Sequence, residues 1–581
     1  MANQLEHEDS PYLQKHKDDL VVWWPWCDEA FDEAQKQNKA IFISVGYSAS
    51  HWCQVMQEEI FNNQACADLL NESFISIKVD RDERPDIARY YQKVYQLLNN
   101  ETASWPTTIF ATPQNRPFFA RAYMRADSIE GSNEGIGFLE MATIVAGKIK
   151  DADVKLFENA DEIESFLKKI EHPKEATVLK EEFYKNFMLQ AKQNYDAKNG
   201  GFGSEPKFPY VSLLASLHLI VKTYEDDDAK EMLFASLNAM HQGGFYDLVD
   251  GGFFPYVTDA KWSMPHFEKR LYDNALLAEI YLDAYSLSGN ERYLESAKES
   301  VDFWLDKMSQ DSLLFSFSDA TQNYSGGLYY TFEYQEVFES LSAEGLSDVA
   351  KKCELLSITP EGNFQGRNII RLSGKKPSYF PDVQKVLKKL RAQKSAPSCD
   401  KRVHTSYSAM MIYTLFKLSS VDASYKEKAS KVLETLLDTF YINGQLYHTT
   451  ILGKTPKVKA FLEDYAYLSR ALLTSYKHSG DELHLINAQR MINKALEEFY
   501  KKGYWSFSGG EYATKAQIDD NSYMSAVSII VESMLTLGEL LKDEKYIHFA
   551  FKTLEYNSYE IGRKPIYSAH MLSQVIRYVR G

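Results

Sequence analysis

The sequence predicts two domains of different fold class: an α/β domain over residues 1–150 and an all-α domain over residues 178–581. Two observations predict this division. The first 150 residues alternate apolar strand patterns with helical patterns, whereas the later residues contain paired helical patterns at a regular spacing. Residues 151–177, where Lys and Glu are frequent and a proline interrupts the pattern, are expected to be a linker.

The α/β domain contains strands, a turn and helices in an order typical of the thioredoxin fold. Buried strands are predicted at Ala40–Val45 and Phe74–Asp80, with a helical pattern after each of them. Pro106 then precedes a third apolar strand, Thr107–Ala111. In thioredoxin folds a cis-proline just before a strand faces the active-site turn. We therefore predict that the Trp105–Pro106 bond is cis and faces that turn.

The predicted turn, Tyr47–Met56 (YSASHWCQVM), contains a single cysteine. Disulfide exchangers place Cys-x-x-Cys at the start of a helix, because the helix N-terminus stabilises the thiolate. Here Ser50 replaces the first cysteine and only Cys53 remains, so we predict that dithiol exchange is lost. A redox protein that uses Cys53 alone is an alternative. The expected turn residues are Ser50, His51, Trp52 and Pro106.

The all-α domain shows a repeat of about 60 residues. Spacings of 58, 65, 74, 56 and 59 residues separate the expected starts of its inner helices, which are Tyr210, Glu268, Glu333, Tyr407, Glu463 and Ser522. A helical hairpin buries its apolar stripe only against neighbouring hairpins, so such a repeat predicts a ring. The pattern contains one hairpin too many for a ring of six, and an insertion near Glu333 is an alternative.

Polar residues before the inner helices are expected to line one funnel, because the N-terminal ends of inner helices share one face. Carboxylates can act as acid and base in glycoside chemistry, a histidine can move a proton in epimerisation, and aromatic rings can cover a sugar. Acidic residues also cap helices without any catalysis, which is the alternative explanation. The expected catalytic residues are His266, Glu268, Asp464, Asp319 and Cys53, and the expected substrate-binding residues are Trp262, Asp273, Tyr407, Glu463 and Tyr256.

Composition narrows the class of partner. The net charge of −16, from 65 basic and 81 acidic residues, disfavours nucleic-acid binding. No apolar run approaches the ~18 residues of a membrane span, and the N-terminal residues lack signal-peptide features. The five cysteines form no Cys-x-x-Cys pair and fit a reducing compartment. We expect a cytoplasmic protein with no cofactor, no metal, and neither nucleic acid nor membrane as a partner.

Eight segments carry a resemblance to a known family: SPYLQKH (10–16), WWPW (23–26), SHWCQVM (50–56), VDRDERPDI (79–87), GGFGSEPKFPY (200–210), MPHFEKRLYDNALL (264–277), EGNFQGRNII (361–370) and FLEDYAYL (461–468). The chain resembles thioredoxin-domain-containing proteins with a mammalian branch described as spermatogenesis-associated. The resemblance implies a thioredoxin-like domain fused to an (α/α)6 six-hairpin barrel like those of glycosidases. It implies a barrel that binds or transforms a carbohydrate or sugar derivative by epimerase- or glycosidase-like chemistry, with the thioredoxin-like domain docking a protein partner.

The chain departs from the family pattern at polar positions. Gln54 replaces a histidine, Arg270 replaces a Met, Thr321 replaces an Asp, and Tyr407-Ser408-Ala409 replaces Trp-Asn-Gly. Core patterns persist while these positions differ, which indicates functional drift on a retained fold. A noncatalytic interaction or scaffold protein therefore stays an alternative, and the sequence leaves substrate, reaction and oligomeric state open.

Overall fold

The computed structural model describes residues 3–48, 50–101, 104–128, 136–168, 175–318 and 327–580. The chain divides into two compact units. Unit 1 comprises Met1–His172 with Phe507–Lys515, and unit 2 comprises Pro173–Ser506 with Ala516–Gly581. The expected linker is largely helical, because it contains α7 (Val154–Lys168), which packs on strand β5 within unit 1. Among the described residues, no helix is both long enough and apolar enough to cross a membrane.

Unit 1 is built around a mixed five-stranded sheet with the order β1-β3-β2-β4-β5. Strands β1, β2 and β3 run parallel, whereas β4 is antiparallel to β2 and β5. The strands are β1 (Trp23–Trp24), β2 (Ala40–Gly46), β3 (Phe74–Asp80), β4 (Thr107–Ala111) and β5 (Pro117–Arg121). The three strands expected from the sequence are therefore confirmed, and the two missed strands lie at the sheet edges.

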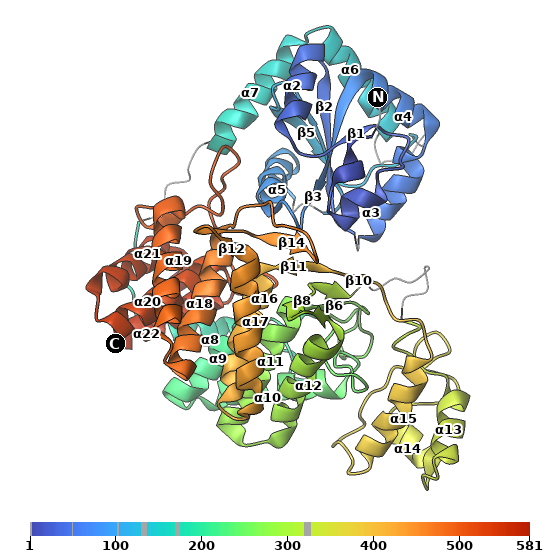
Figure 1. The fold of residues 1–581 in the computed structure, drawn as a ribbon, viewed down its shortest axis with the longest axis vertical. Helices are drawn as coiled ribbons and strands as arrows, with labels where there is room; N and C mark the ends of the chain where they lie inside the picture. The colour runs from blue at the N-terminus through green and yellow to red at the C-terminus, as the bar shows by residue number, and fades with distance from the viewer. Residues whose placement is uncertain are drawn as a thin grey trace. The chain divides into compact units, whose positions relative to one another are not determined.

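Helices cover both faces of this sheet (Figure 1). Side chains alternate along β2, so Phe42 joins one core while Ile41 and Ile43 join the other. The first core contains α1 (Pro11–Lys15), α3 (His51–Met56) with its continuation η2 (Gln57–Phe61), α4 (Gln64–Ser73), α6 (Phe138–Lys150) and residues of η1 (Gln4–His7). The second contains α2 (Asp28–Gln37) and α5 (Pro85–Asn99), and α7 contributes residues to both cores. This arrangement is that of a thioredoxin-like domain.

Unit 2 contains a closed ring of six inner helices within the described residues. Each inner helix contacts the next, and the last contacts the first. The ring consists of α9 (Val211–Tyr224), α11 (Leu271–Ser288), α16 (Thr405–Ser419), α18 (Leu462–Ser479), α20 (Ala526–Leu541) and α22 (Ala569–Arg580). Helix α11 shows why these helices are inner: consecutive residues from Leu271 to Leu282 are all buried, as in a helix surrounded by others.

Among the described residues, six outer helices each bury the side chains of one face only. Helix α12 buries Leu294, Ala297, Val301 and Trp304, which recur at the helical spacing of three or four residues. The outer helices are α8 (Phe183–Asn194), α10 (Asp227–Gln242), α12 (Glu291–Lys307), α17 (Ser424–Phe440), α19 (Glu482–Phe499) and α21 (Glu544–Arg563). Short strands lie in the loops: β6 (Lys269–Arg270), β7 (Ser309–Gln310), β8 (Leu313–Leu314), β9 (Phe317–Ser318), β10 (Cys399–Asp400), β11 (Arg402–His404), β12 (Tyr441–Ile442), β13 (Gln445–Leu446), β14 (Thr449–Ile451), β15 (Tyr500–Lys501) and β16 (Tyr504–Trp505).

The helix expected at Glu333 is not an inner helix, which corrects one of the predicted starts. Helices α13 (Tyr334–Ala343), α14 (Val349–Leu355) and α15 (Phe380–Ala392) form an insertion between β9 and β10, in which α13 contacts both of the others. Helix α13 buries only Val337 and Leu341, too little for an element surrounded by helices. The alternative of an insertion is confirmed, and α22 provides the sixth inner helix.

Candidate functional site

The segment before α11 brings an ion pair to the N-terminal end of the barrel. The guanidinium of Arg270 donates to both carboxylate oxygens of Glu268, at 2.9 and 2.8 Å, and His266 Nε2 lies 3.6 Å from Oε2. Burial raises the pKa of Glu268, but Arg270 and His266 outweigh it and lower this pKa to about 2. Glu268 is therefore an anion.

Asp273, in the first turn of α11, has the opposite character. Its side chain is buried, and burial raises its pKa to about 7; the positive charge of Arg270 lowers this pKa and the negative charge of Glu268 raises it. Oδ2 of Asp273 has no hydrogen-bond partner among the described residues. This carboxyl group can therefore gain or lose a proton near neutral pH, which a general acid or base requires.

A group of tyrosines joins this segment to the next inner helices. Arg270 Nη1 donates to the hydroxyl of Tyr272 at 3.0 Å. The ring of Tyr272 lies 4.9 Å from that of Tyr407 and 5.2 Å from that of Tyr523. The hydroxyl of Tyr523 donates to Glu463 Oε2 at 3.1 Å.

The structure thus brings five predicted residues into one group, which we call the Glu268 cluster. The cluster consists of His266, Glu268, Asp273, Tyr407 and Glu463 together with Arg270, Tyr272 and Tyr523. The sequence analysis recognised Arg270 only as a departure from the family and missed both tyrosines. Their signal was available, since each aromatic residue lies at or just before an inner helix start.

Tyr256 also lies beside this cluster, as expected. Its ring stacks on the ring of His266, with centroids 5.0 Å apart and planes 10° from parallel. The His266 side chain is 36% exposed, whereas that of Glu268 is 5% exposed. The histidine is therefore the part of the His266–Glu268 pair that solvent or a ligand reaches first.

Trp262 does not line this site, which corrects its expected substrate-binding role. Its side chain is fully buried, its Nε1 donates to the carbonyl of Gly200 at 3.0 Å, and its ring packs against Phe245 at 5.1 Å. The neighbouring ring of Phe253 is buried as well. Both rings fill the core beneath the loops, because large apolar surfaces there stabilise the fold.

Asp464 is likewise structural, which corrects its expected catalytic role. It is completely buried in the first turn of α18, and both of its oxygens accept hydrogen bonds: Oδ1 from the Ser406 amide at 3.2 Å, and Oδ2 from the Phe461 amide at 2.9 Å and His448 Nδ1 at 2.8 Å. The first turn of a helix leaves amide groups without partners, and Asp464 satisfies one of them. Asp319 lies outside the described residues.

The turn of unit 1 keeps its shape without the first cysteine. Ser50 caps α3, since its Oγ accepts from the Cys53 amide at 3.3 Å. The Trp105–Pro106 bond is cis, which confirms that prediction; that it faces the turn stays a prediction. Trp52 is 51% exposed and contacts Tyr123, whereas Cys53 is only 2% exposed. The burial of Cys53 disfavours the single-cysteine redox alternative, because exchange requires an accessible thiolate. The side chain of His51 lies outside the described part of the chain.

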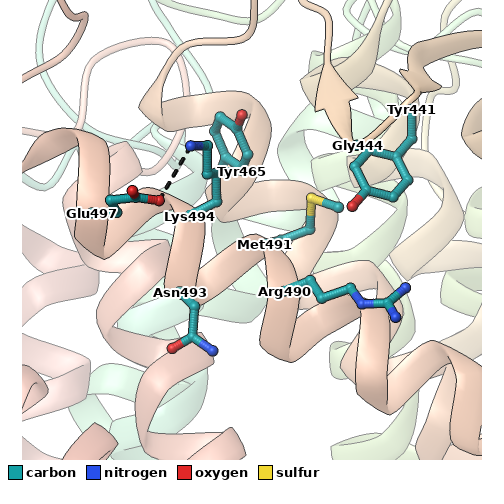
Figure 2. Close-up of a pocket in the computed structure, with 8 residues that line it drawn as sticks. All are labelled: Tyr441, Gly444, Tyr465, Arg490, Met491, Asn493, Lys494 and Glu497. Atoms are coloured by element: carbon teal, nitrogen blue, oxygen red, sulfur yellow. Dashed lines mark hydrogen bonds and ion pairs between the residues drawn. The ribbon is translucent and has the colours of Figure 1, made fainter.

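A cavity of about 310 Å³ opens beside outer helix α19, and none of the predicted site residues lines it (Figure 2). Lys494 in its wall pairs with Glu497 at 3.2 Å. The residues around it are Tyr441, Gly444, Tyr465, Arg490, Met491, Asn493, Lys494 and Glu497. None of the residues that line this cavity belongs to the Glu268 cluster.

Fold and site together define a class of protein in which a thioredoxin-like unit and a six-hairpin helical barrel occupy one chain. Residues 2–168 match the family model Thioredox_DsbH, described as "Protein of unknown function, DUF255". Human spermatogenesis-associated protein 20 is 32% identical over 88% of this chain and 71% of its own length. The rat protein of that name is 30% identical over 93% of this chain and 76% of its own length. The chain therefore belongs to the spermatogenesis-associated protein 20 family.

An uncharacterized protein of Caenorhabditis elegans is also similar, with 29% identity over 94% of this chain and 81% of its own length. Among solved structures, the cellobiose 2-epimerase of Spirochaeta thermophila has a TM-score of 0.46 and 11% identity, covering 72% of this chain and 97% of its own. A GH76 α-mannanase of Bacteroides thetaiotaomicron has a TM-score of 0.43 and 13% identity, covering 68% and 95%. Similarity at this level carries no conclusion about the activity of this chain.

Proposed function

We propose that the barrel of unit 2 binds a carbohydrate at the Glu268 cluster and that Asp273 exchanges a proton with it. One arrangement carries the proposal: the buried Glu268–Arg270 pair lies against the partly exposed ring of His266, and Asp273, three residues after Arg270, has a buried carboxyl oxygen with no hydrogen-bond partner among the described residues. Carboxylates accept hydrogen bonds from sugar hydroxyls, and rings cover the apolar faces of pyranoses. A few polar side chains among aromatic rings are typical of such sites.

The two carboxyl groups take different roles in this proposal. Arg270 keeps Glu268 ionised, so Glu268 orients the ligand by accepting hydrogen bonds and does not donate a proton. Asp273, whose pKa is raised to about 7, is the acid or base. Enzymes can assign the charged role and the acid or base role to two carboxyl groups by placing them in environments that move their pKa values apart.

A second candidate function is binding without chemistry. Its support is the Glu268–Arg270 pair, which engages both oxygens of the carboxylate expected to be catalytic. In this case the same cluster recognises a ligand, and Asp273 serves only to accept or donate a hydrogen bond. The two candidates share the ligand and differ in whether the ligand is converted.

A thermal-shift screen of the full chain with sugars, sugar phosphates and nucleotide sugars tests the binding. We expect a stabilising ligand whose effect is lost in His266→Ala, with the unliganded melting temperature retained because this side chain is partly exposed. His548→Ala is the matched control, since His548 is exposed on α21, and should keep the full shift. The proposal fails if no sugar shifts the wild-type protein, or if both variants respond alike.

Nuclear magnetic resonance in D2O then separates the two candidates. Epimerase-like chemistry incorporates solvent deuterium at a sugar carbon, and glycosidase-like chemistry releases a new reducing end. We expect Asp273→Asn to bind the stabilising sugar and to abolish either change. A wild-type protein that binds the sugar and leaves it unaltered favours the noncatalytic candidate.

A further inference from the structure

Exposed aromatic rings continue outward from the Glu268 cluster. The ring of Phe208 lies 5.2 Å from that of Tyr256, and the ring of Tyr210 lies 6.3 Å from that of Phe208. Phe208 is 40% exposed, Tyr210 42% and Tyr567 60%. Burial, and after it the charge of the Tyr567 phenol, raise the pKa of Tyr210. We call Tyr256, Phe208, Tyr210 and Tyr567 the aromatic strip.

The aromatic strip crosses loops that precede three inner helices. Phe208 and Tyr210 precede α9, Tyr256 lies in the loop before α11, and Tyr567 precedes α22. Its inner end is Tyr256, which stacks on His266 of the Glu268 cluster. The strip is therefore continuous with the proposed site and lies at the same end of the barrel.

Tyr210 supplies an independent observation, because its backbone is strained. It occupies the N-cap of α9 in the left-handed region, at φ 47° and ψ 57°, and its side chain makes no capping hydrogen bond. A bulky residue is unfavourable in this region, and small polar residues are preferred at an N-cap. The ring is also 42% exposed, so burial in the core is not the reason for a tyrosine here. Strain of this kind clusters at ligand sites.

We propose that the aromatic strip binds an extended, uncharged glycan whose terminal sugar occupies the Glu268 cluster. This inference rests on the proposed carbohydrate-binding function and adds the size of the ligand. Neighbouring centroids are 5.0, 5.2 and 6.3 Å apart and the ring planes are 10°, 32° and 68° from parallel, so the rings turn along the strip. Their exposed surfaces can contact more than one pyranose, and a single sugar would leave part of them uncovered.

Charge favours an uncharged glycan over an acidic one. Lys207, next to Phe208, is fully buried and pairs with Asp196 at 2.7 Å, so it does not present a cation to the strip. Glu205 in the same loop is exposed, and Glu268 at the inner end is ionised. Arg270 pairs with Glu268, and the Lys564 ammonium lies 5.8 Å from the centroid of the Tyr567 ring, so acidic and basic groups both border the strip. The strip therefore shows no excess of cations that would select an acidic sugar chain.

Titration of the full chain with manno-, cello- and malto-oligosaccharides of one to six residues tests the inference. For one of these series we expect the Kd to fall at least tenfold between the monosaccharide and the hexasaccharide. Phe208→Ala and Tyr210→Asn should each weaken hexasaccharide binding about tenfold and leave monosaccharide binding unchanged. Phe166→Ala, which removes an equally exposed ring from unit 1, is the control and should change neither Kd.

The Tyr210→Asn variant also tests the strain. Asparagine tolerates the left-handed region, so the variant should melt no lower than the wild type while it loses hexasaccharide affinity. Equal affinity for the monosaccharide and the hexasaccharide would overturn the aromatic strip and leave the proposed function standing. Unchanged hexasaccharide affinity in Phe208→Ala would overturn it as well. Failure of every saccharide, here and in the thermal-shift screen, overturns both proposals.

Discussion

At the scale of single residues, Glu268 and Asp273 show how one charge separates two neighbouring carboxyl groups. Both are buried, and burial raises the pKa of each. Arg270 contacts Glu268 through two hydrogen bonds and lowers its pKa to about 2, whereas Asp273 has no such partner and its pKa rises to about 7. The difference between the two pKa values depends on geometry, because the pKa of a buried acid is lowered by a cation in direct contact and raised where burial is not offset.

The first prediction concerns the Glu268–Arg270 pair. Because the pKa of Glu268 is lowered from 4.5 to about 2, ionised Glu268 stabilises the fold above pH 4.5, and this stability is lost as pH falls toward 2. The contribution is about 3 kcal/mol. Arg270→Met should cost about 3–5 kcal/mol at pH 7 in urea unfolding, since it leaves a buried carboxylate unpaired.

Two further variants control this measurement. Arg270→Met combined with Glu268→Gln should recover part of the lost free energy, because no buried charge then stays unpaired. Arg577→Met breaks a pair with Glu539 in which the arginine is partly buried and the glutamate exposed, and should cost clearly less than Arg270→Met. An Arg270→Met protein as stable as the wild type at pH 7 would show that the pair does not form.

The second prediction concerns Asp273. Its pKa is raised from 3.8 to about 7, so ionisation opposes folding and stability falls as pH rises from about 4 to 7. Asp273→Asn removes this cost and should stabilise the protein by up to about 4 kcal/mol at pH 8 and by little at pH 4. Asp438→Asn, at an exposed position on α17, should change stability little at either pH. A stabilisation that does not vary with pH would contradict the raised pKa.

At the scale of elements, α3 shows why the loss of a cysteine left the helix start intact. The hydroxyl of Ser50 accepts from the Cys53 amide, so it satisfies one of the amides that a helix start leaves unpaired. A serine at this position is a preferred cap and contributes about 1 kcal/mol. The turn therefore keeps the geometry of a dithiol site while it lacks the thiol that begins exchange.

The third prediction follows from that geometry. The wild-type protein should reduce insulin in the presence of dithiothreitol no faster than the reagent alone. Ser50→Cys should form a reducible bridge to Cys53, detected as protection of both thiols from alkylation until dithiothreitol is added. Ser50→Cys combined with Cys53→Ala is the control and should show no such protection. Acceleration by the wild type that disappears in Cys53→Ala would refute the predicted loss of exchange.

At the scale of the whole molecule, unit 1 depends on a segment from far along the chain. Tyr512 packs its ring against Trp26 at 5.1 Å and Tyr90 at 5.3 Å, and its hydroxyl accepts from Asn115 Nδ2 at 3.0 Å. All these contacts lie inside unit 1, which includes Phe507–Lys515. The thioredoxin-like core is therefore completed by residues encoded between helices of the barrel.

The fourth prediction tests this dependence. Tyr512→Ala should destabilise unit 1 by about 2 kcal/mol, because a half-buried ring and a hydrogen bond are lost. Hydrogen exchange of the β2 and β3 amides reports on unit 1 separately from the barrel. Tyr567→Ala, which removes an exposed ring from unit 2, should leave these amides unchanged. Equal exchange in both variants would show that the segment contributes nothing to unit 1.

The amino-acid sequence by itself determined the features that neighbouring residues encode. Strands β2, β3 and β4 were predicted to within one residue, since an unbroken apolar run specifies a buried strand. The change from Cys to Ser at position 50, the repeat of the hairpins and the motif around Glu268 are also visible without a fold. Each of these is a local pattern of spacing, polarity or residue type.

Only the tertiary structure decided which residues meet. Glu463 and Asp464 are adjacent in sequence, yet one joins the Tyr523 side of the Glu268 cluster and the other caps α18. Trp262 is a core ring, α22 and not the Glu333 helix closes the barrel, and Arg270 divides the pKa values of Glu268 and Asp273. The physical reason is that burial, ion pairing and ring closure are set by contacts between distant segments, which a one-dimensional pattern does not contain.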